Sequence, residues 1–360
     1  RRAWPLILLL FGAACAPAEE RSPAYDATAL PERLSEWGVL SAHDGVLELA
    51  PGATPYDLAT PLFSDYAQKL RTISLPPGTS ASYSANDVFD LPVGTILTKT
   101  FYYSASEGGV ASGAERTLAG GLMTLAGLRL IETRVLHRRA DGWVALPYVW
   151  NEAQTDADLR RTGEIIETTL HRPDGRAEPL AYFVPNANQC AGCHATDNST
   201  RAIQPIGLRA RHLNKPSSFA APMNQLDHWR MAGILTGEFA DAAAAPRNAA
   251  WTDETASLDA RARAYLDANC SHCHSDVGPA DTSGLDLTPG APMGPKTGLC
   301  KTTIAAGAGS GGLSYDIVPG KPDESIFVFR METTDAAAMM PELGRSVTHE
   351  EGVALIRTWI

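Results

Sequence analysis

Two short motifs combine cysteine and histidine at a spacing that permits both covalent and metal chemistry. Cys190–His194 reads C-A-G-C-H, and Cys270–His274 reads C-S-H-C-H. Two thiols at this spacing can form thioethers with the two vinyl groups of haem, and the next histidine then lies under the iron. The sequence predicts two covalent c-type haems, attached at Cys190, Cys193, Cys270 and Cys273, with His194 and His274 as iron ligands.

Other uses of these cysteines agree less well with the sequence. A structural zinc site needs tetrahedral Cys/His coordination, but the two motifs lie far apart in the chain and each carries its own histidine. A thioredoxin-like redox pair needs a βαβ context, for which the sequence around the motifs gives no signal. Two copies of C-x-x-C-H in one chain therefore favour haem.

Each iron would also take a sixth ligand, and a methionine thioether is a common one. Met340, which precedes Pro341, is the expected ligand of the second haem, in preference to Met339. Met223 is the candidate for the first haem, because it follows Pro222 and stands before a helical segment. Core filling is the alternative role of these methionines. The alternatives at the first haem are His212, then Met231 and His228, and an open sixth position.

The remaining cysteine and histidine residues carry weaker signals. Cys300 has no predicted partner and is expected to be a buried thiol. His272 lies between the cysteines of the second motif and is expected to face solvent. His137 and His171 fall on predicted strands and are expected to be sheet residues rather than ligands.

The segment from residue 57 to 184 has the pattern of a β-rich domain. Its runs of β-branched and aromatic residues are separated by turn signals such as Asp141-Gly142. Several short strands of this kind predict a sandwich or a small barrel. The clearest expected strands are Gly94–Tyr103, Leu128–Arg138, Trp143–Trp150, Gly163–His171 and Glu178–Val184.

The pattern becomes helical after residue 184. One helix is expected over Asn224–Leu235, and a second, capped by Ser257, runs into Cys270. The last helix is expected to open with a capping box at Thr348–Glu351. The predicted fold is a multidomain α+β chain, with an N-terminal β-rich sandwich- or barrel-like domain followed by mainly α-helical, cytochrome c-like haem-binding regions.

The N-terminus has the features of an export signal. A positive start, an apolar run at Leu6–Phe11 and small residues before Cys15 predict a signal peptide with a lipobox over residues 1–15. Cys15 would then carry lipid and tether the protein to a membrane; an incidental cysteine is the alternative. The predicted division continues with a tether and N-terminal segment (16–56), the β-rich domain (57–184), the first haem region (185–250) and the second haem domain (251–360).

The formal net charge of −11 limits the kinds of molecule that the protein is expected to bind. It argues against non-specific binding to nucleic acid, which requires basic patches. It is compatible with a basic redox partner, because complementary charge accelerates encounter, and equally with ordinary solubility.

Beyond the two motifs, the chain resembles a bacterial family of exported two-haem c-type cytochromes of the conserved hypothetical lipoprotein type. Its last third also resembles class I and planctomycete-type cytochrome c domains, in the order helix, C-x-x-C-H, loop, methionine, helix. The segments that carry the resemblance are Leu62–Tyr66, Leu91–Thr95, Trp143–Glu152, Gln189–His194, Pro205–Gly207, Asn269–His274, Ile317–Pro322 and Met340–Arg345.

The resemblance implies a periplasmic electron-transfer protein with two haem c groups and unidentified redox partner proteins. It also implies a parallel β-helix protein as a candidate partner, and Tyr265 and Trp359 as aromatic contacts between the terminal helices. Two further functions stay open from the sequence. One is a haem enzyme, peroxidase-like or a small-molecule oxidase, acting at the first haem. The other is a ligand-binding β domain with the haems in a supporting role.

Overall fold

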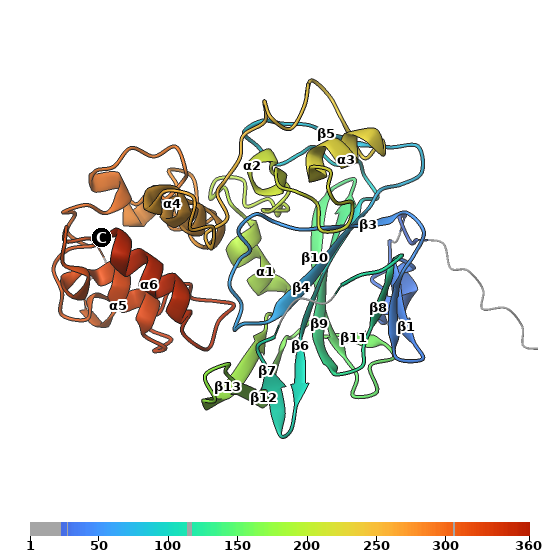
Figure 1. Cartoon of the computed structure of the whole chain (residues 1–360), viewed down its shortest axis with the longest axis horizontal. Coiled ribbons are helices and arrows are strands. Elements are labelled where there is room, and N and C mark those ends of the chain that lie inside the picture. The colour runs from blue at the N-terminus through green and yellow to red at the C-terminus, as the bar shows by residue number, and fades with distance from the viewer. Residues whose placement is uncertain (1–22, 27, 114–116, 305–306) are drawn as a thin grey trace, which may run out of the picture.

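The computed structural model describes residues 23–26, 28–113, 117–304 and 307–360, which form two lobes (Figure 1). The larger lobe is built around a β-sheet. The smaller lobe contains the helices α4 (Leu258–Asn269), α5 (Ile326–Glu332) and α6 (Glu350–Trp359). The predicted signal peptide and Cys15 lie outside the described residues. No helix in the described part of the chain has both the length and the apolar character needed to cross a bilayer.

The main sheet has nine strands, paired antiparallel except where β7 meets β12. Its order is β11-β10-β9-β6-β7-β12-β13, and β4 lies beside β6 with β3 beyond it. The strands are β3 (Ala53–Tyr56), β4 (Gln68–Ser74), β6 (Ile96–Ser106), β7 (Gly109–Ala111), β9 (Leu128–Arg139), β10 (Gly142–Trp150), β11 (Ala157–Leu159), β12 (Glu164–His171) and β13 (Ala177–Val184).

The β-rich N-terminal region is confirmed, and its form is one large curled sheet, a half-barrel, rather than a sandwich. The long strands β6 and β9 twist together, and their register shifts at Phe101/Tyr102. Such a bulge bends the strand and increases its twist. The smaller sheets consist of β1 (Leu40–His43), β2 (Val46–Leu49) and β8 (Leu122–Thr124), and of β5 (Ala81–Ser82) with β14 (Leu235–Thr236).

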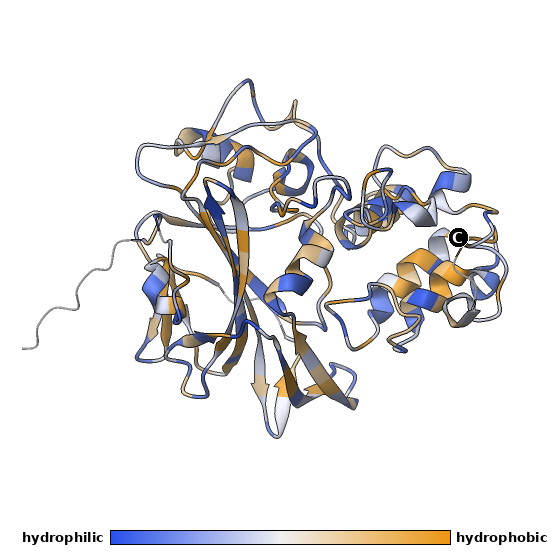
Figure 2. Cartoon of the chain, turned by 180° about the vertical axis from the view of Figure 1, so that it is seen from behind, coloured by the Kyte–Doolittle hydropathy of each residue, from blue (hydrophilic) through white to orange (hydrophobic). Residues whose placement is uncertain are grey.

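Hydrophobic clusters cover both faces of this sheet, and hydrophobic residues recur along its strands (Figure 2). On one face Trp37 is fully buried, and its indole Nε1 donates to the Tyr148 hydroxyl at 2.8 Å. On the other face α2 (Ala210–Leu213) and α3 (Gln225–Met231) cover the Ile73 and Leu97 side chains. Burial of these apolar groups holds the connection after residue 195 against the sheet.

The smaller lobe is held together where α4 crosses α6. A Cβ added at Gly352 would lie 2.3 Å from the Tyr265 hydroxyl oxygen, so only glycine allows this close approach. The Trp359 indole Nε1 donates to Asp259 at 2.9 Å. The predicted contacts of Tyr265 and Trp359 with the opposite helix are therefore confirmed.

Long loops join these helices, and helix makes up only 20% of the part of the chain that the structure describes. Mainly α-helical haem regions therefore stay a prediction. Short 3-10 helices lie at Leu34–Trp37, Asp281–Ser283, Pro295–Thr297, Gly307–Ser310 and Pro322–Glu324.

Two predicted helix boundaries were wrong. The helix expected over Asn224–Leu235 ends at Met231, because Gly233 turns the chain with a φ of +71°. The final helix begins at Glu350 without the expected capping box, because the Thr348 hydroxyl donates to the Glu332 carbonyl oxygen at 2.7 Å instead. The start of α4 was predicted correctly, with the Ser257 hydroxyl accepting from the Ala260 amide at 3.2 Å.

Candidate functional site

The second motif borders a large cavity in the smaller lobe. α4 ends at Asn269, so Cys270 follows the helix directly and its position is fixed by the helix. The cavity measures about 510 Å³, within the range of roughly 300–1,000 Å³ that small-molecule and cofactor pockets occupy. Its walls bring together the predicted attachment and ligand residues Cys270, Cys273, His274 and Met340, with Phe63 and Tyr265 beside them.

His274 is oriented by its neighbour. Its Nδ1 lies 3.0 Å from the Ser283 hydroxyl oxygen, which leaves Nε2 as the nitrogen free to bind a metal. Burial lowers the pKa of His274 to about 4. The imidazole is therefore neutral near pH 7, which is the form that ligates iron.

Met340 lies on the wall of the same cavity, and Met339 is not among the lining residues. The backbone around Met340 is fixed on both sides, because its amide donates to the Arg330 carbonyl at 2.8 Å and its carbonyl accepts from Arg345 Nε at 3.0 Å. The structure thus places Met340 and His274 on one cavity, as the sequence analysis expected of a pair of axial ligands.

The first motif lies on α1 (Ala187–His194), a helix that the sequence analysis did not predict. Asn186 and Gln189 form its capping box, the Asn186 side chain accepting from the Gln189 amide at 2.8 Å. His194 Nδ1 lies 2.8 Å from the Gln204 carbonyl oxygen, and burial lowers the pKa of His194 to about 4. His194 is therefore oriented in the same way as His274.

The cavity beside α1 is smaller, about 140 Å³, and His212 is among its lining residues. His212 is 2% exposed, and its Nδ1 has no hydrogen-bond partner within the described chain. Met223 is not among the lining residues, nor is His228, and Met231 is 70% exposed. Of the residues considered for the sixth position at the first motif, the structure brings only His212 to this cavity.

The two motifs are in contact with each other. Cys273 Sγ lies 3.7 Å from the Gly192 carbonyl oxygen. Cys193 and His272 line both cavities, so the two cavities share a wall. His272 was predicted to face solvent and is instead buried, because the first motif covers it.

A buried carboxylate joins the two lobes at this point. Asp267 on α4 accepts from Arg211 Nε at 2.7 Å and from Asn248 Nδ2 at 2.7 Å, and His212 Nε2 lies 3.5 Å away. Burial is the largest single influence and acts to raise the pKa of Asp267, but the hydrogen bonds from Arg211 and Asn248 and the charges of Arg211 and His212 together outweigh it, so the pKa falls below its ordinary value of 3.8. The carboxylate is therefore charged at neutral pH and fixes Arg211 and His212 against α4.

Replacing Asp267 by Asn is expected to lower the free energy of unfolding at pH 7 by about 3–5 kcal/mol, because it leaves the partly buried Arg211 charge without its fully buried partner. A lowered carboxyl pKa stabilises the fold above the ordinary value of 3.8, and this stabilisation is lost as the pH falls through the lower, folded-state pKa. The difference between variant and wild type should therefore narrow below about pH 4. Urea unfolding at pH 7 and pH 3 measures this difference in the free energy of unfolding. The control is Asp276→Asn, an exposed partner of Lys296; an equal loss in both variants would contradict the role of Asp267.

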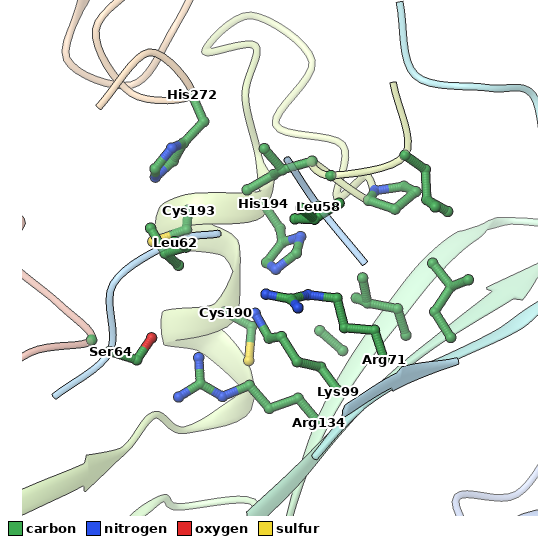
Figure 3. A pocket seen from close by; sticks show the side chains of 18 of the residues that line it. Leu58, Leu62, Ser64, Arg71, Lys99, Arg134, Cys190, Cys193, His194 and His272 are labelled. Carbon is green, nitrogen blue, oxygen red and sulfur yellow. The ribbon is translucent and has the colours of Figure 1, made fainter. Parts of the chain in front are cut away.

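Three cationic side chains reach from the sheet towards Cys190 and His194 (Figure 3). They are Arg71 on β4, Lys99 on β6 and Arg134 on β9. Burial, with Arg134 and Arg71 nearby, lowers the pKa of Lys99 to about 7. The sequence analysis assigned these residues no role, because their meeting depends on strand register.

The segment Leu62–Tyr66 connects the two cavities, and its role was also missed. Leu62 and Ser64 line the first cavity, and Phe63 lines the second. The Phe63 ring stacks on His349 with centroids 4.2 Å apart, and its amide donates to the Asn269 side chain at 2.8 Å. The only sequence signal for this segment was its place among the family-like motifs.

The other cysteine and histidine predictions had mixed outcomes. Cys300 is exposed rather than buried, and it occupies a turn with a φ of +51°. His137 and His171 lie on β9 and β12 as expected, and His137 Nε2 contacts the Tyr25 carbonyl oxygen at 2.9 Å.

No protein-family model, curated protein or solved structure matches the chain. The function therefore has to be inferred from the two cavities and the residues that line them.

Proposed function

We propose that this chain is an exported two-haem c-type cytochrome that transfers electrons between redox partner proteins. The observation that carries the proposal is that each C-x-x-C-H motif borders a cavity and that the two cavities share Cys193 and His272. Two cofactors held there would lie side by side. An electron could then enter the protein at one cofactor and leave from the other.

The donor set of the second cavity fits haem. It offers two thiols, a neutral imidazole with one free nitrogen, and a thioether in a mostly apolar space of about 510 Å³. Haem bound there would supply a one-electron couple whose potential the axial ligands and burial set. The protein's own contribution is to hold His274 through Ser283 and Met340 through Arg330.

The elements around this cavity follow the order of a class I cytochrome c domain. α4 precedes Cys270, a long loop follows His274, and Met340 stands between α5 and α6. The close crossing of α4 and α6 at Tyr265 and Gly352 supports the same arrangement. We therefore propose that residues 251–360 form a cytochrome c-like unit.

The first cavity has the donors Cys190, Cys193 and His194 but less space. The side chains of Arg71, Lys99 and Arg134 extend into it (Figure 3). At about 140 Å³ this cavity lies below the range of roughly 300–1,000 Å³ of cofactor pockets, so these side chains would have to move to admit a haem. His212 is proposed as the sixth ligand in place of Met223, because it lines this cavity and its Nδ1 has no partner among the described residues.

The same proposal predicts where the protein resides and which kinds of partner it meets. Covalent haem attachment agrees with export to the periplasm, where the predicted lipid on Cys15 would anchor the chain. The net charge of −11 favours basic redox partners and gives no reason to expect nucleic acid. The parallel β-helix partner implied by the family resemblance stays a prediction.

The alternative of a haem enzyme depends on the sixth position of the first haem, since an iron with an open position can bind small molecules. EPR and optical spectra of the purified full-length protein separate the two functions. Electron transfer predicts two six-coordinate, low-spin haems that do not react with CO or cyanide. A high-spin signal that shifts on adding cyanide would overturn pure electron carriage and favour an enzyme.

A further inference from the structure

The C-terminal end of α5 is held by the segment of chain that carries Met340. α5 ends at Glu332, so its last carbonyl groups lack partners within the helix. The Arg330 carbonyl oxygen accepts from the Met340 amide at 2.8 Å and from Arg345 Nη2 at 3.1 Å. The Thr333 carbonyl oxygen accepts from the same Nη2 at 2.8 Å. Arg345 therefore caps the end of α5.

The Arg345 guanidinium also fixes the main chain of Met340. Its Nε donates to the Met340 carbonyl oxygen at 3.0 Å, and its Nη1 lies 3.5 Å from the Val347 carbonyl oxygen. Arg345 is 4% exposed and lines the second cavity. All three of its nitrogens nevertheless lie against main-chain carbonyls. The side chain thus holds the Met340 segment in place.

A carboxylate of the larger lobe anchors the residues that follow Arg345. Asp65 is 2% exposed, and its Oδ1 accepts from the Ser346 amide at 2.7 Å and from the Val347 amide at 3.0 Å. The Tyr103 hydroxyl on β6 donates to the Asp65 carbonyl oxygen at 2.7 Å. Burial lowers the pKa of Arg345, and the charge of Asp65 acts in the opposite direction. Asp65 thus joins the sheet to the segment that Arg345 holds.

The turn that presents Asp65 has an unusual backbone. A hydrogen bond of 2.9 Å from the Ala67 amide to the Ser64 carbonyl oxygen closes it. Its two central residues, Asp65 and Tyr66, have φ values of +49° and +62°. Residues other than glycine keep such a conformation only where their surroundings impose it. The contacts of Asp65 with both lobes are surroundings of this kind.

We propose that the larger lobe positions Met340 on the second cavity through two positioning residues, Asp65 and Arg345. This inference rests on the proposed function, in which Met340 is the sixth ligand of the second haem. It adds that this ligand depends on a carboxylate from the other lobe. A change in the β-sheet lobe should therefore alter the second haem.

The test compares full-length wild type with Asp65→Gly, which removes the carboxylate and adopts a φ of +49° without strain. The variant should lose half or more of the near-infrared methionine–iron band. Hydrogen exchange at the Met340 amide, resolved from its neighbours, should accelerate about tenfold or more, because hydrogen bonds to a charged group are lost. Asp65→Asn keeps an oxygen that accepts from both amides, so it should restore the band and the slow exchange.

The matched control is Thr348→Val. The Thr348 hydroxyl donates to the Glu332 carbonyl oxygen at 2.7 Å, so it ties a neighbouring residue to the end of α5 without contacting Met340. This variant should keep the wild-type band and exchange. Arg345→Lys, which keeps the charge but loses the fork of donors, should lose the band as Asp65→Gly does. If Arg345→Lys does not fold, the comparison of Asp65→Gly with Asp65→Asn still decides.

A wild-type band and wild-type Met340 exchange in Asp65→Gly would overturn the inference. Equal losses in Thr348→Val and Asp65→Gly would overturn it as well, because they would show only general loosening of the lobe. A wild type without covalent haem would refute the proposed function alone. Hydrogen exchange needs no haem, and it would still show whether Asp65 holds the Met340 segment.

Discussion

The double variant Cys270→Ala/Cys273→Ala is expected to lose one covalent haem and to unfold the smaller lobe. Haem would fill the cavity of about 510 Å³ between α4, α5 and α6. At roughly 24 cal/mol per Å³, leaving a cavity of about 510 Å³ unfilled costs on the order of 10 kcal/mol. This is comparable with the whole stability of a typical domain, roughly 5–15 kcal/mol, so we expect the lobe not to fold without its cofactor.

The matching change at the first motif should have a much smaller effect on stability. The first cavity measures about 140 Å³, for which the same relation gives about 3 kcal/mol. Cys190→Ala/Cys193→Ala should therefore lose one haem and keep the fold of both lobes. Pyridine haemochrome assay counts the haems, and far-UV circular dichroism during urea unfolding reports the lobes. Cys300→Ala, at an exposed cysteine, is the control. Equal stability of the two double variants would contradict the assignment of the large cavity.

Replacing Met340 by Ala is expected to lower the reduction potential of the second haem and to abolish its weak near-infrared methionine–iron band. A thioether ligand raises the potential of haem iron, and axial ligands set haem potentials over a range of about 0.8 V. The fall in potential should be a substantial part of that range. Redox titration with optical detection measures both effects.

Met339→Ala is the matched control, because it removes the neighbouring methionine, which does not line the cavity. It should leave the band and the potential close to those of wild type. Loss of the band in Met339→Ala, with an unchanged Met340→Ala protein, would show that the two methionines were assigned the wrong way round.

The strands were predictable because runs of β-branched and aromatic residues, and an alternating pattern at Leu128–Arg138, are visible in the sequence. The predicted segments Gly94–Tyr103 and Leu128–Arg138 correspond to β6 (Ile96–Ser106) and β9 (Leu128–Arg139). What alternation does not contain is the pairing between strands. The parallel contact of β7 with β12 and the curl of the sheet depend on register and twist, which only the folded chain fixes.

The residues of the candidate site that can be recognised from their neighbours in the sequence were predictable. The two C-x-x-C-H motifs and Met340 are recognisable by spacing and by neighbours, and the structure places Met340 with His274 on one cavity. The helix α1 could also have been found, because Asn186 and Gln189 have the spacing of a capping box. Its eight residues are too few for a clear helical periodicity.

The features that depend on distant segments could not be predicted. His272 is buried because the first motif packs over it, although the two are far apart in the chain. Arg71, Lys99 and Arg134 come from three strands, and only their register makes them a row. Met223 and His212 were ranked by sequence context alone, whereas their distance from the first motif is set by how α2 and α3 cover the sheet.

Counting covalent haems per chain tests the central claim most directly. Mass spectrometry of the denatured full-length protein, together with pyridine haemochrome absorbance, measures this number without reference to activity. We predict two haems on every chain, retained after denaturation because they are bound through thioethers. One haem would contradict the role of one motif, and a chain with free thiols at Cys190, Cys193, Cys270 and Cys273 would contradict the proposed function altogether.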